Sequence, residues 1–211
     1  MKRILLQGDS ITDCGRKRDR FDDLGAGYAN LVGCHLRCEH PNEYEVLNRG
    51  IGGNRVIDLY GRGRKAIIVL EPDFMSIMIG GNDVWHELEF QNGISAEKFE
   101  TLYDMMLAEI KEALPNLQMM ILGPYVLDGS ATASYYEEFR REVDLRAEAA
   151  KRIAEKYALP YVDLQALFDE AEKKAPSSYW LEDGVHPVAA GKELIKRAWL
   201  ECFYQNWGQA E

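Results

Sequence analysis

The sequence of 211 residues lacks both an excess of basic charge and any long apolar run. Its 35 acidic side chains outnumber the 25 basic ones, which gives a formal net charge of −10. Nucleic-acid binding draws much of its affinity from Lys and Arg placed on phosphates, and anionic membranes attract the same side chains. We therefore expect no nucleic-acid partner and no membrane partner.

The apolar stretches are short from the first residues onward. The N-terminal run covers only Ile4–Leu6, well short of the roughly 7–15 residues of a signal-peptide core. No later run approaches the roughly 20 apolar residues of a membrane helix. With 46% hydrophobic residues, the chain has the composition of a globular protein with a sizeable core. We expect one cytoplasmic domain that spans residues 1–211.

Cysteine is scarce, with four residues at positions 14, 34, 38 and 202. Cys34 and Cys38 lie four apart in a predicted helix, but no second pair of ligands accompanies them, which disfavours a zinc site. We expect reduced, buried thiols, no metal and no organic cofactor.

Five apolar runs alternate with longer amphipathic segments. The runs are Ile4–Leu6, Tyr44–Leu47, Phe74–Ile79, Met119–Leu122 and Tyr161–Asp163. The helical segments are Tyr28–Cys38, Val56–Ile68, Ala96–Leu114, Ser134–Tyr157 and Pro187–Tyr204. Continuous apolar strands separated by helices indicate a parallel sheet that is covered on both faces. The pattern predicts a flavodoxin-like three-layer α/β sandwich with strand order 2-1-3-4-5.

Two other patterns have a structural interpretation. The basic segment 61–65, Gly-Arg-Gly-Arg-Lys, is expected to be a solvated helix end. Trp199, Phe203 and Trp207 recur every four residues and predict the core-facing side of a helix. The alternative for this aromatic stripe is a subunit interface, so a homo-oligomer remains open.

Polar, glycine-rich segments follow the first three predicted strands. They are residues 8–13, residues 48–55 and residues 80–83. Ligands of open α/β sheets bind beyond the carboxyl ends of the strands. We expect these three segments to converge on one site.

A serine nucleophile needs a base, and the base needs a group that fixes its tautomer. Of the four histidines, His186 is the best base, because Asp183 lies three residues before it and Pro187 marks a helix start. Of the seven serines, only Ser10 sits at the carboxyl end of a strand with a glycine nearby. No Gly-x-Ser-x-Gly elbow is present, which disfavours the standard α/β-hydrolase arrangement. Asp9 also adjoins Ser10, and we expect it to cap loop amides rather than to orient His186.

Acyl transfer also requires donors for a developing oxyanion. The backbone N–H groups of Ser10 and Gly53 and the side-chain amide of Asn82 are candidates. The register leaves Gly52 open as an alternative to Gly53. The rings of Trp85, His86, Tyr125 and Trp180 adjoin these segments, and with Asp9 they are candidate pocket residues. Aromatic faces can stack on sugar rings, and packing of the pocket wall is the alternative.

These segments resemble the conserved blocks of the SGNH (GDSL) hydrolases. Residues 8–12 resemble block I, residues 48–53 block II, residues 80–83 block III and residues 183–187 block V. The four residues that name the family fall on Ser10, Gly53, Asn82 and His186. The resemblance extends over nearly the whole chain and implies a serine esterase without a cofactor.

A narrower resemblance concerns residues 14–16, 24–28 and 82–85, which are similar to intracellular acetylxylan esterases. Those enzymes remove acetyl groups from xylo-oligosaccharides, and some are homo-oligomers. The resemblance implies hydrolysis of small acyl esters, acetylated sugars above all, through an acyl-enzyme on Ser10. A thioesterase or lysophospholipase of the same superfamily is the alternative within enzymes. A catalytically silent carbohydrate-binding protein is the alternative outside them.

Overall fold

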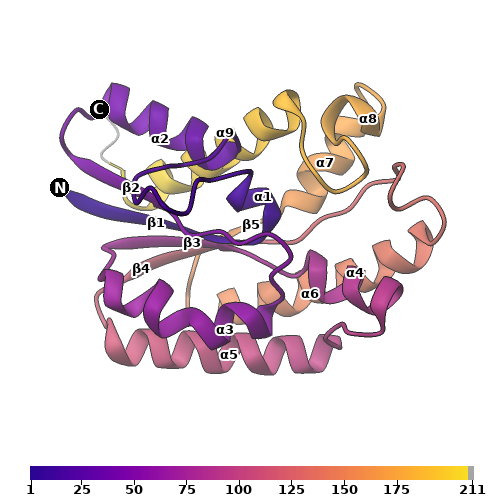
Figure 1. The fold of residues 1–211 in the computed structure, drawn as a ribbon, viewed down its shortest axis with the longest axis horizontal. Coiled ribbons are helices and arrows are strands. Elements are labelled where there is room, and N and C mark those ends of the chain that lie inside the picture. The colour runs from indigo at the N-terminus through magenta and orange to yellow at the C-terminus, as the bar shows by residue number, and fades with distance from the viewer. Residues whose placement is uncertain (209–211) are drawn as a thin grey trace.

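A computed structural model describes residues 1–208 and shows a parallel sheet between two layers of helices (Figure 1). The strands are β1 (Lys2–Gly8), β2 (Tyr44–Asn48), β3 (Phe74–Met78), β4 (Gln118–Leu122) and β5 (Tyr161–Val162). All neighbours pair in parallel in the order β2-β1-β3-β4-β5. The predicted fold class and strand order are confirmed. Among residues 1–208, no helix combines the length and the hydropathy that crossing a bilayer demands.

The helices divide between the two faces of the sheet. On one face lie α1 (Ser10–Asp13), α2 (Tyr28–Glu39), α7 (Leu164–Glu172), α8 (Ser177–Trp180) and α9 (Ala189–Asn206) (Figure 1). On the other lie α3 (Val56–Ala66), the short turn η1 (Ile68–Leu70), α5 (Ala96–Ala113) and α6 (Tyr136–Lys156), with α4 (Gly81–Phe90) beside α6.

The five long predicted helices are found within two residues at each end. Sequence patterns missed α1, α4, α7 and α8. The helices α1 and α8 have only four residues each. The helix α4 begins at Gly81, directly after Gly80, and a pair of glycines is typical of a turn.

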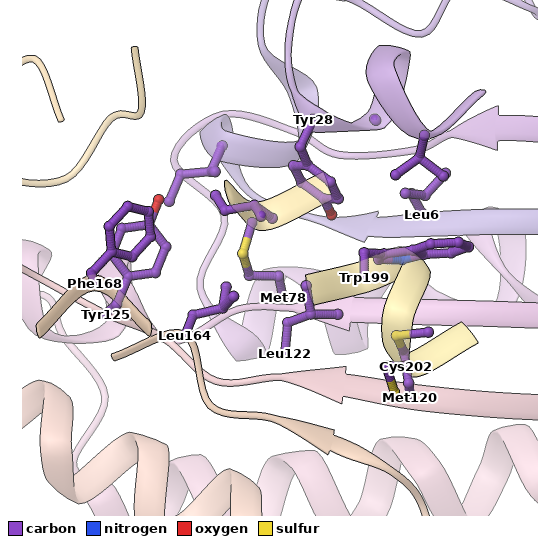
Figure 2. Close-up of a cluster of buried hydrophobic side chains, with 14 of the residues drawn as sticks. Leu6, Tyr28, Met78, Met120, Leu122, Tyr125, Leu164, Phe168, Trp199 and Cys202 are labelled. Carbon is purple, nitrogen blue, oxygen red and sulfur yellow. The ribbon is translucent and has the colours of Figure 1, made fainter. Parts of the chain in front are cut away.

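Strand β1 shows why the strands read as continuous apolar runs. Ile4 and Leu6 face a cluster under α2 and α9, while Leu5 faces a second cluster under α3 and α5. All three side chains are fully buried, because helices cover both faces of the sheet. Figure 2 shows the first cluster, in which Tyr28 and Trp199 pack on side chains of the central strands.

The aromatic stripe of α9 belongs to this first cluster. Trp199 is fully buried and Phe203 is 2% exposed, and their rings stack with centroids 5.1 Å apart. The ring of Trp207 lies 4.6 Å from that of Phe74. The core-facing interpretation of the stripe is therefore confirmed.

One sequence expectation about the surface is wrong, and a second holds only in part. Cys34 and Cys38 are exposed free thiols, while Cys202 is buried. The buried face of α2 carries Val32 and Leu36, and positions two residues further along point to the opposite side of a helix.

Arg64 and Lys65 are exposed in the last turn of α3, as expected of a solvated helix end, but Arg62 is not part of it. Its guanidinium donates to the carbonyl oxygens of Gly8 and Arg49 and to side-chain oxygens of Gln7 and Asn54. The helix α3 packs beside the carboxyl ends of β1 and β2, where the chain leaves the sheet and its carbonyl groups need donors.

Candidate active site

Ser10 is held at the turn where β1 meets α1. The carboxylate of Asp9 caps α1 by accepting a hydrogen bond from the Ile11 N–H at 3.1 Å. A Cβ atom on Gly8 would lie 2.5 Å from the Met78 carbonyl oxygen, so this turn requires glycine. Because Ser10 is the first residue of α1, its N–H has no acceptor within the helix.

Three predicted residues from distant parts of the chain form one hydrogen-bonded relay. Ser10 Oγ lies 2.9 Å from His186 Nε2, across 176 positions of sequence. His186 Nδ1 lies 2.7 Å from Asp183 Oδ2. The other carboxylate oxygen of Asp183 accepts the backbone N–H groups of Val185 and His186 at 2.9 and 2.8 Å. This geometry suits a serine whose proton passes to an oriented imidazole.

The charges of the relay support the same chemistry. Burial acts to raise the pKa of Asp183, but its hydrogen bonds with the His186 ring and with two backbone N–H groups outweigh burial and lower that pKa to about 2. The hydrogen bond to Asp183 raises the pKa of His186 above its ordinary value, against the opposing effect of burial. The carboxylate is thus ionised at neutral pH and stabilises an imidazolium.

A loop that sequence reasoning missed holds Asp183 in place. The Leu127 N–H donates to the Gly184 carbonyl at 2.9 Å, and the Ala131 N–H donates to the Asp183 carbonyl at 3.0 Å. A Cβ on Gly129 would lie 2.4 Å from the Asp183 carbonyl carbon. The available signal was the Asp-Gly-Ser turn at 128–130, which is typical of a tight loop.

The two glycines of the second loop differ in what their N–H groups do. The Gly52 N–H donates to Asp13 Oδ2 at 3.0 Å. Gly53 has a φ of 79° and open space beside its Cα, and among the described residues its N–H has no acceptor. The amide of Asn82 donates to the Asn54 carbonyl at 3.2 Å, which orients it and leaves its second hydrogen available.

A small cavity of about 10 Å³ lies against Ser10. Asp9, Asn82 and Tyr125 contribute to its lining together with apolar residues. Tyr125 is 3% exposed, so its ring is part of the pocket wall. Burial raises the pKa of Asp9 to about 6, against the lowering effect of its bond from the Ile11 N–H.

The other predicted pocket residues, Trp85, His86 and Trp180, do not line this cavity. The Trp85 ring is 5.9 Å from the His186 ring and flanks the relay. His86 lies against Phe90 on α4. The Trp180 indole N–H donates to the Ala175 carbonyl at 3.1 Å, so this ring packs at the end of α8.

Asp83 is a buried carboxylate of the site that sequence reasoning did not single out. Both of its oxygens accept the Val56 N–H, at 3.0 and 3.1 Å, and tie the start of α4 to the start of α3. Burial raises its pKa to about 7. The sequence signal for Asp83 was its position directly after Asn82. Within residues 1–208, no group of three His, Cys, Asp or Glu side chains is placed to hold a metal ion.

Comparisons with known proteins identify the relatives of this chain. The model of the GDSL-like Lipase/Acylhydrolase family matches residues 6–194. An acetylxylan esterase of Geobacillus stearothermophilus is 33% identical over 215 residues, which cover 98% of this chain and 95% of that protein. A solved Parabacteroides merdae protein described as GDSL-like is 36% identical with a TM-score of 0.90, over 95% of this chain and 94% of that one.

A solved variant of a Geobacillus acetyl-xylooligosaccharide esterase is 32% identical with a TM-score of 0.87, over 100% of this chain and 97% of that one. Other structures of the same esterase are described as catalytic mutants, with a serine, an aspartate or a histidine replaced by alanine. That aspartate and histidine lie three positions apart, as Asp183 and His186 do.

Proposed function

Since the chain belongs to the GDSL-like lipase/acylhydrolase family and is a carboxylic ester hydrolase, we propose a specific reaction for it. It removes acetyl groups from acetylated xylo-oligosaccharides through an acyl-enzyme on Ser10. The observation that carries the proposal is the relay from Ser10 Oγ to His186 Nε2 at 2.9 Å and from His186 Nδ1 to Asp183 Oδ2 at 2.7 Å.

The proposed reaction has two steps on this relay. Ser10 Oγ attacks the acetyl carbonyl while its proton passes to His186 Nε2, and Asp183 stabilises the resulting imidazolium. The N–H groups of Ser10 and Gly53 and the Asn82 amide hold the oxyanion. His186 then protonates the departing sugar oxygen, which leaves as a hydroxyl group. Water, activated by the same imidazole, releases acetate and restores Ser10.

The occupied N–H of Gly52 supports Gly53 as the oxyanion donor. Asp13 already accepts the Gly52 hydrogen, so this group would have to break a bond before it could serve a substrate. The Gly53 N–H carries no such bond among the described residues. A donor that is free before the reaction needs no rearrangement as charge develops.

The size of the cavity beside Ser10 supports a short acyl group. Its volume of about 10 Å³ is near the minimum that holds one water molecule, which favours a methyl group over a fatty chain. A thioesterase or lysophospholipase would need a long apolar groove at this position. A sugar as the alcohol of the ester is supported by the relatives, which act on acetylxylan and acetyl-xylooligosaccharides, and by the Trp85 ring beside His186.

The test compares wild type with Ser10→Ala and, as a matched control, with Ser178→Ala, an exposed serine. Hydrolysis of 4-nitrophenyl acetate should fall on the order of 10⁴-fold or more in Ser10→Ala and stay unchanged in Ser178→Ala. Acetate release from acetylated xylo-oligosaccharides should follow the same pattern. Full activity in Ser10→Ala would refute the mechanism.

A series of 4-nitrophenyl esters tests the acyl preference. We expect kcat/KM to fall at least about tenfold from acetyl to butyryl, because one added methylene in a filled pocket already changes discrimination by roughly 10-fold or more. A rate that rises with chain length would instead favour the long-acyl alternative.

A further inference from the structure

A second cavity, of about 450 Å³, lies beside the edge strand β2. Six cationic side chains contribute to its lining: Arg16, Arg18, Arg20, Arg49, Arg62 and Lys65. They come from the loop after α1, from the end of β2 and from α3. We call this site the basic cavity. These six positive charges gather in one place although the formal net charge of the chain is −10.

Most of these cations have no direct ion-pair partner in the described structure. Among residues 1–208, only Arg18 of the six has a carboxylate oxygen within ion-pair distance, that of Asp13 at 2.7 Å. Burial, together with the charges of Arg16 and Arg18, lowers the pKa of Arg62 to about 10, against weaker opposing carboxylates. Cations that repel one another in a partly buried cavity favour an anion there.

The inner arginines are fixed in position before any ligand arrives. Four protein oxygens hold the guanidinium of Arg62. Arg16 donates to the Gly50 carbonyl at 3.1 Å, and its buried Nε has no acceptor among the described residues. Arg49 lies 4.3 Å over the Phe21 ring. Arg16 and Arg49 keep N–H donors that have no acceptor among the described residues. Such pre-positioned guanidinium groups are suited to a carboxylate, whose two oxygens match the arginine fork.

The rim and the wall add two more features. Arg20 and Lys65 are exposed, and neither side chain has a hydrogen bond or an ion pair within the described structure. Apolar side chains, among them Phe21 and Ile51, also line the cavity. An apolar wall next to cations fits a ring that carries a charge better than it fits a free inorganic ion, because sugar rings pack their C–H faces on apolar surface.

The basic cavity and the Ser10 site share one loop. Ile51 lines the basic cavity, and the next residue borders Ser10, since a Cβ on Gly52 would lie 3.7 Å from Ser10 Cβ. Asp13 bridges the two sites, because one of its oxygens accepts both the Gly52 N–H and the Arg18 guanidinium. The basic cavity and the Ser10 site are therefore neighbours along this loop.

We propose that the basic cavity binds the carboxylate of a uronic acid unit in the same oligosaccharide whose acetyl ester reacts at Ser10. This inference rests on the proposed function. Binding of the uronic acid in the basic cavity makes the enzyme selective for acidic over neutral acetylated oligosaccharides. The residues that give this selectivity lie outside the relay.

The experiment uses three substrates: acetylated xylo-oligosaccharides with a glucuronic acid side group, neutral ones of the same length and acetyl content, and 4-nitrophenyl acetate. The test variant is Arg20→Glu with Lys65→Glu. The control is Lys151→Glu with Lys174→Glu, two exposed lysines outside both sites, which changes the net charge equally. Unfolding in urea checks that all proteins are folded.

We expect the wild type to have a KM for the acidic substrate that is roughly tenfold lower than for the neutral one, as two or three charge-assisted contacts would give. The test variant should lose this advantage, keep its kcat on 4-nitrophenyl acetate and differ from the control variant. Added NaCl should shrink the wild-type advantage, because salt screens charges at the exposed rim.

Competition identifies the ligand class. Glucuronate should inhibit hydrolysis of the acidic substrate at lower concentration than glucose or inorganic phosphate. Equal kcat/KM for acidic and neutral substrates in the wild type would overturn the inference, and so would phosphate inhibition without any advantage for the acidic substrate. A wild type that fails on 4-nitrophenyl acetate would instead refute the proposed function.

Discussion

Asp183→Asn removes one charge from the relay and changes which nitrogen of His186 carries the proton. Asp183 Oδ1 accepts two backbone N–H groups, so an asparagine oxygen would stay at that position and its amide group would face His186 Nδ1. An amide donor requires an unprotonated Nδ1, which places the ring proton on Nε2. Nε2 then cannot accept the proton of Ser10.

The expected loss of kcat in Asp183→Asn follows from the changed tautomer of His186 and from the lost carboxylate charge. The corresponding change in a Ser-His-Asp triad lowers kcat by about 10⁴, which equals about 5.5 kcal/mol of transition-state stabilisation. The stability effect is smaller. The pKa of Asp183 falls from 3.8 to about 2 on folding, and its side chain is 23% exposed. The ionised carboxylate therefore contributes about 2 kcal/mol at neutral pH.

The pH dependence has a definite sign. Because the folded pKa of Asp183 lies below its ordinary value, this contribution is present above about pH 4 and is lost as the pH falls toward 2. In Asp183→Asn this part of the acid sensitivity should disappear. Urea unfolding between pH 2 and pH 7 measures it for both proteins.

The assay is hydrolysis of 4-nitrophenyl acetate, with Asp9→Asn as the control because Asp9 is the other carboxylate beside Ser10. Asp183→Asn should lose about four orders of magnitude in kcat and remain folded, and Asp9→Asn should lose far less. If Asp183→Asn stays within tenfold of wild type while Asp9→Asn is inactive, Asp183 is not the residue that orients the base.

Three further predictions concern the surroundings of the relay. Asn82→Ala should lower kcat by about 10²–10³ with little change in KM, the effect of removing one oxyanion donor, and a loss below fivefold in steady-state kinetics would contradict that role. Gly53→Ala should lower kcat, since φ is 79° there and a Cβ disfavours the donor geometry, whereas Gly61→Ala on the exposed side of α3 should leave kcat unchanged; equal effects would argue against Gly53. Asp9→Asn should raise the free energy of unfolding above pH 6 by up to about 3 kcal/mol. Burial raises the pKa of Asp9 to about 6, so between pH 4 and 6 the carboxyl ionises in the unfolded chain while it stays protonated in the folded one, and the wild type loses stability over that range. A urea series at pH 4 and pH 8 with no gain at pH 8 would contradict this.

The sequence by itself determined the sheet and which polar residues gather at its edge. The runs at Ile4–Leu6 and Phe74–Ile79 are apolar at every position because both faces of the sheet are covered, and this pattern is local. The spacing of Asp183 and His186 is also local, since three residues suffice to bring a carboxylate to Nδ1. The placement of Ser10 at a strand end followed from the alternation of strands and helices.

Only the tertiary structure decided where individual donors and charges go. Gly52 and Gly53 are adjacent glycines in sequence, and they differ because Asp13 from another loop accepts one N–H and not the other. Arg62 lies in a segment that reads as a solvated helix end, yet the ends of β1 and β2 supply its acceptors. Residue type and periodicity set which elements form, but the partner of a given N–H or guanidinium depends on which distant segment packs beside it.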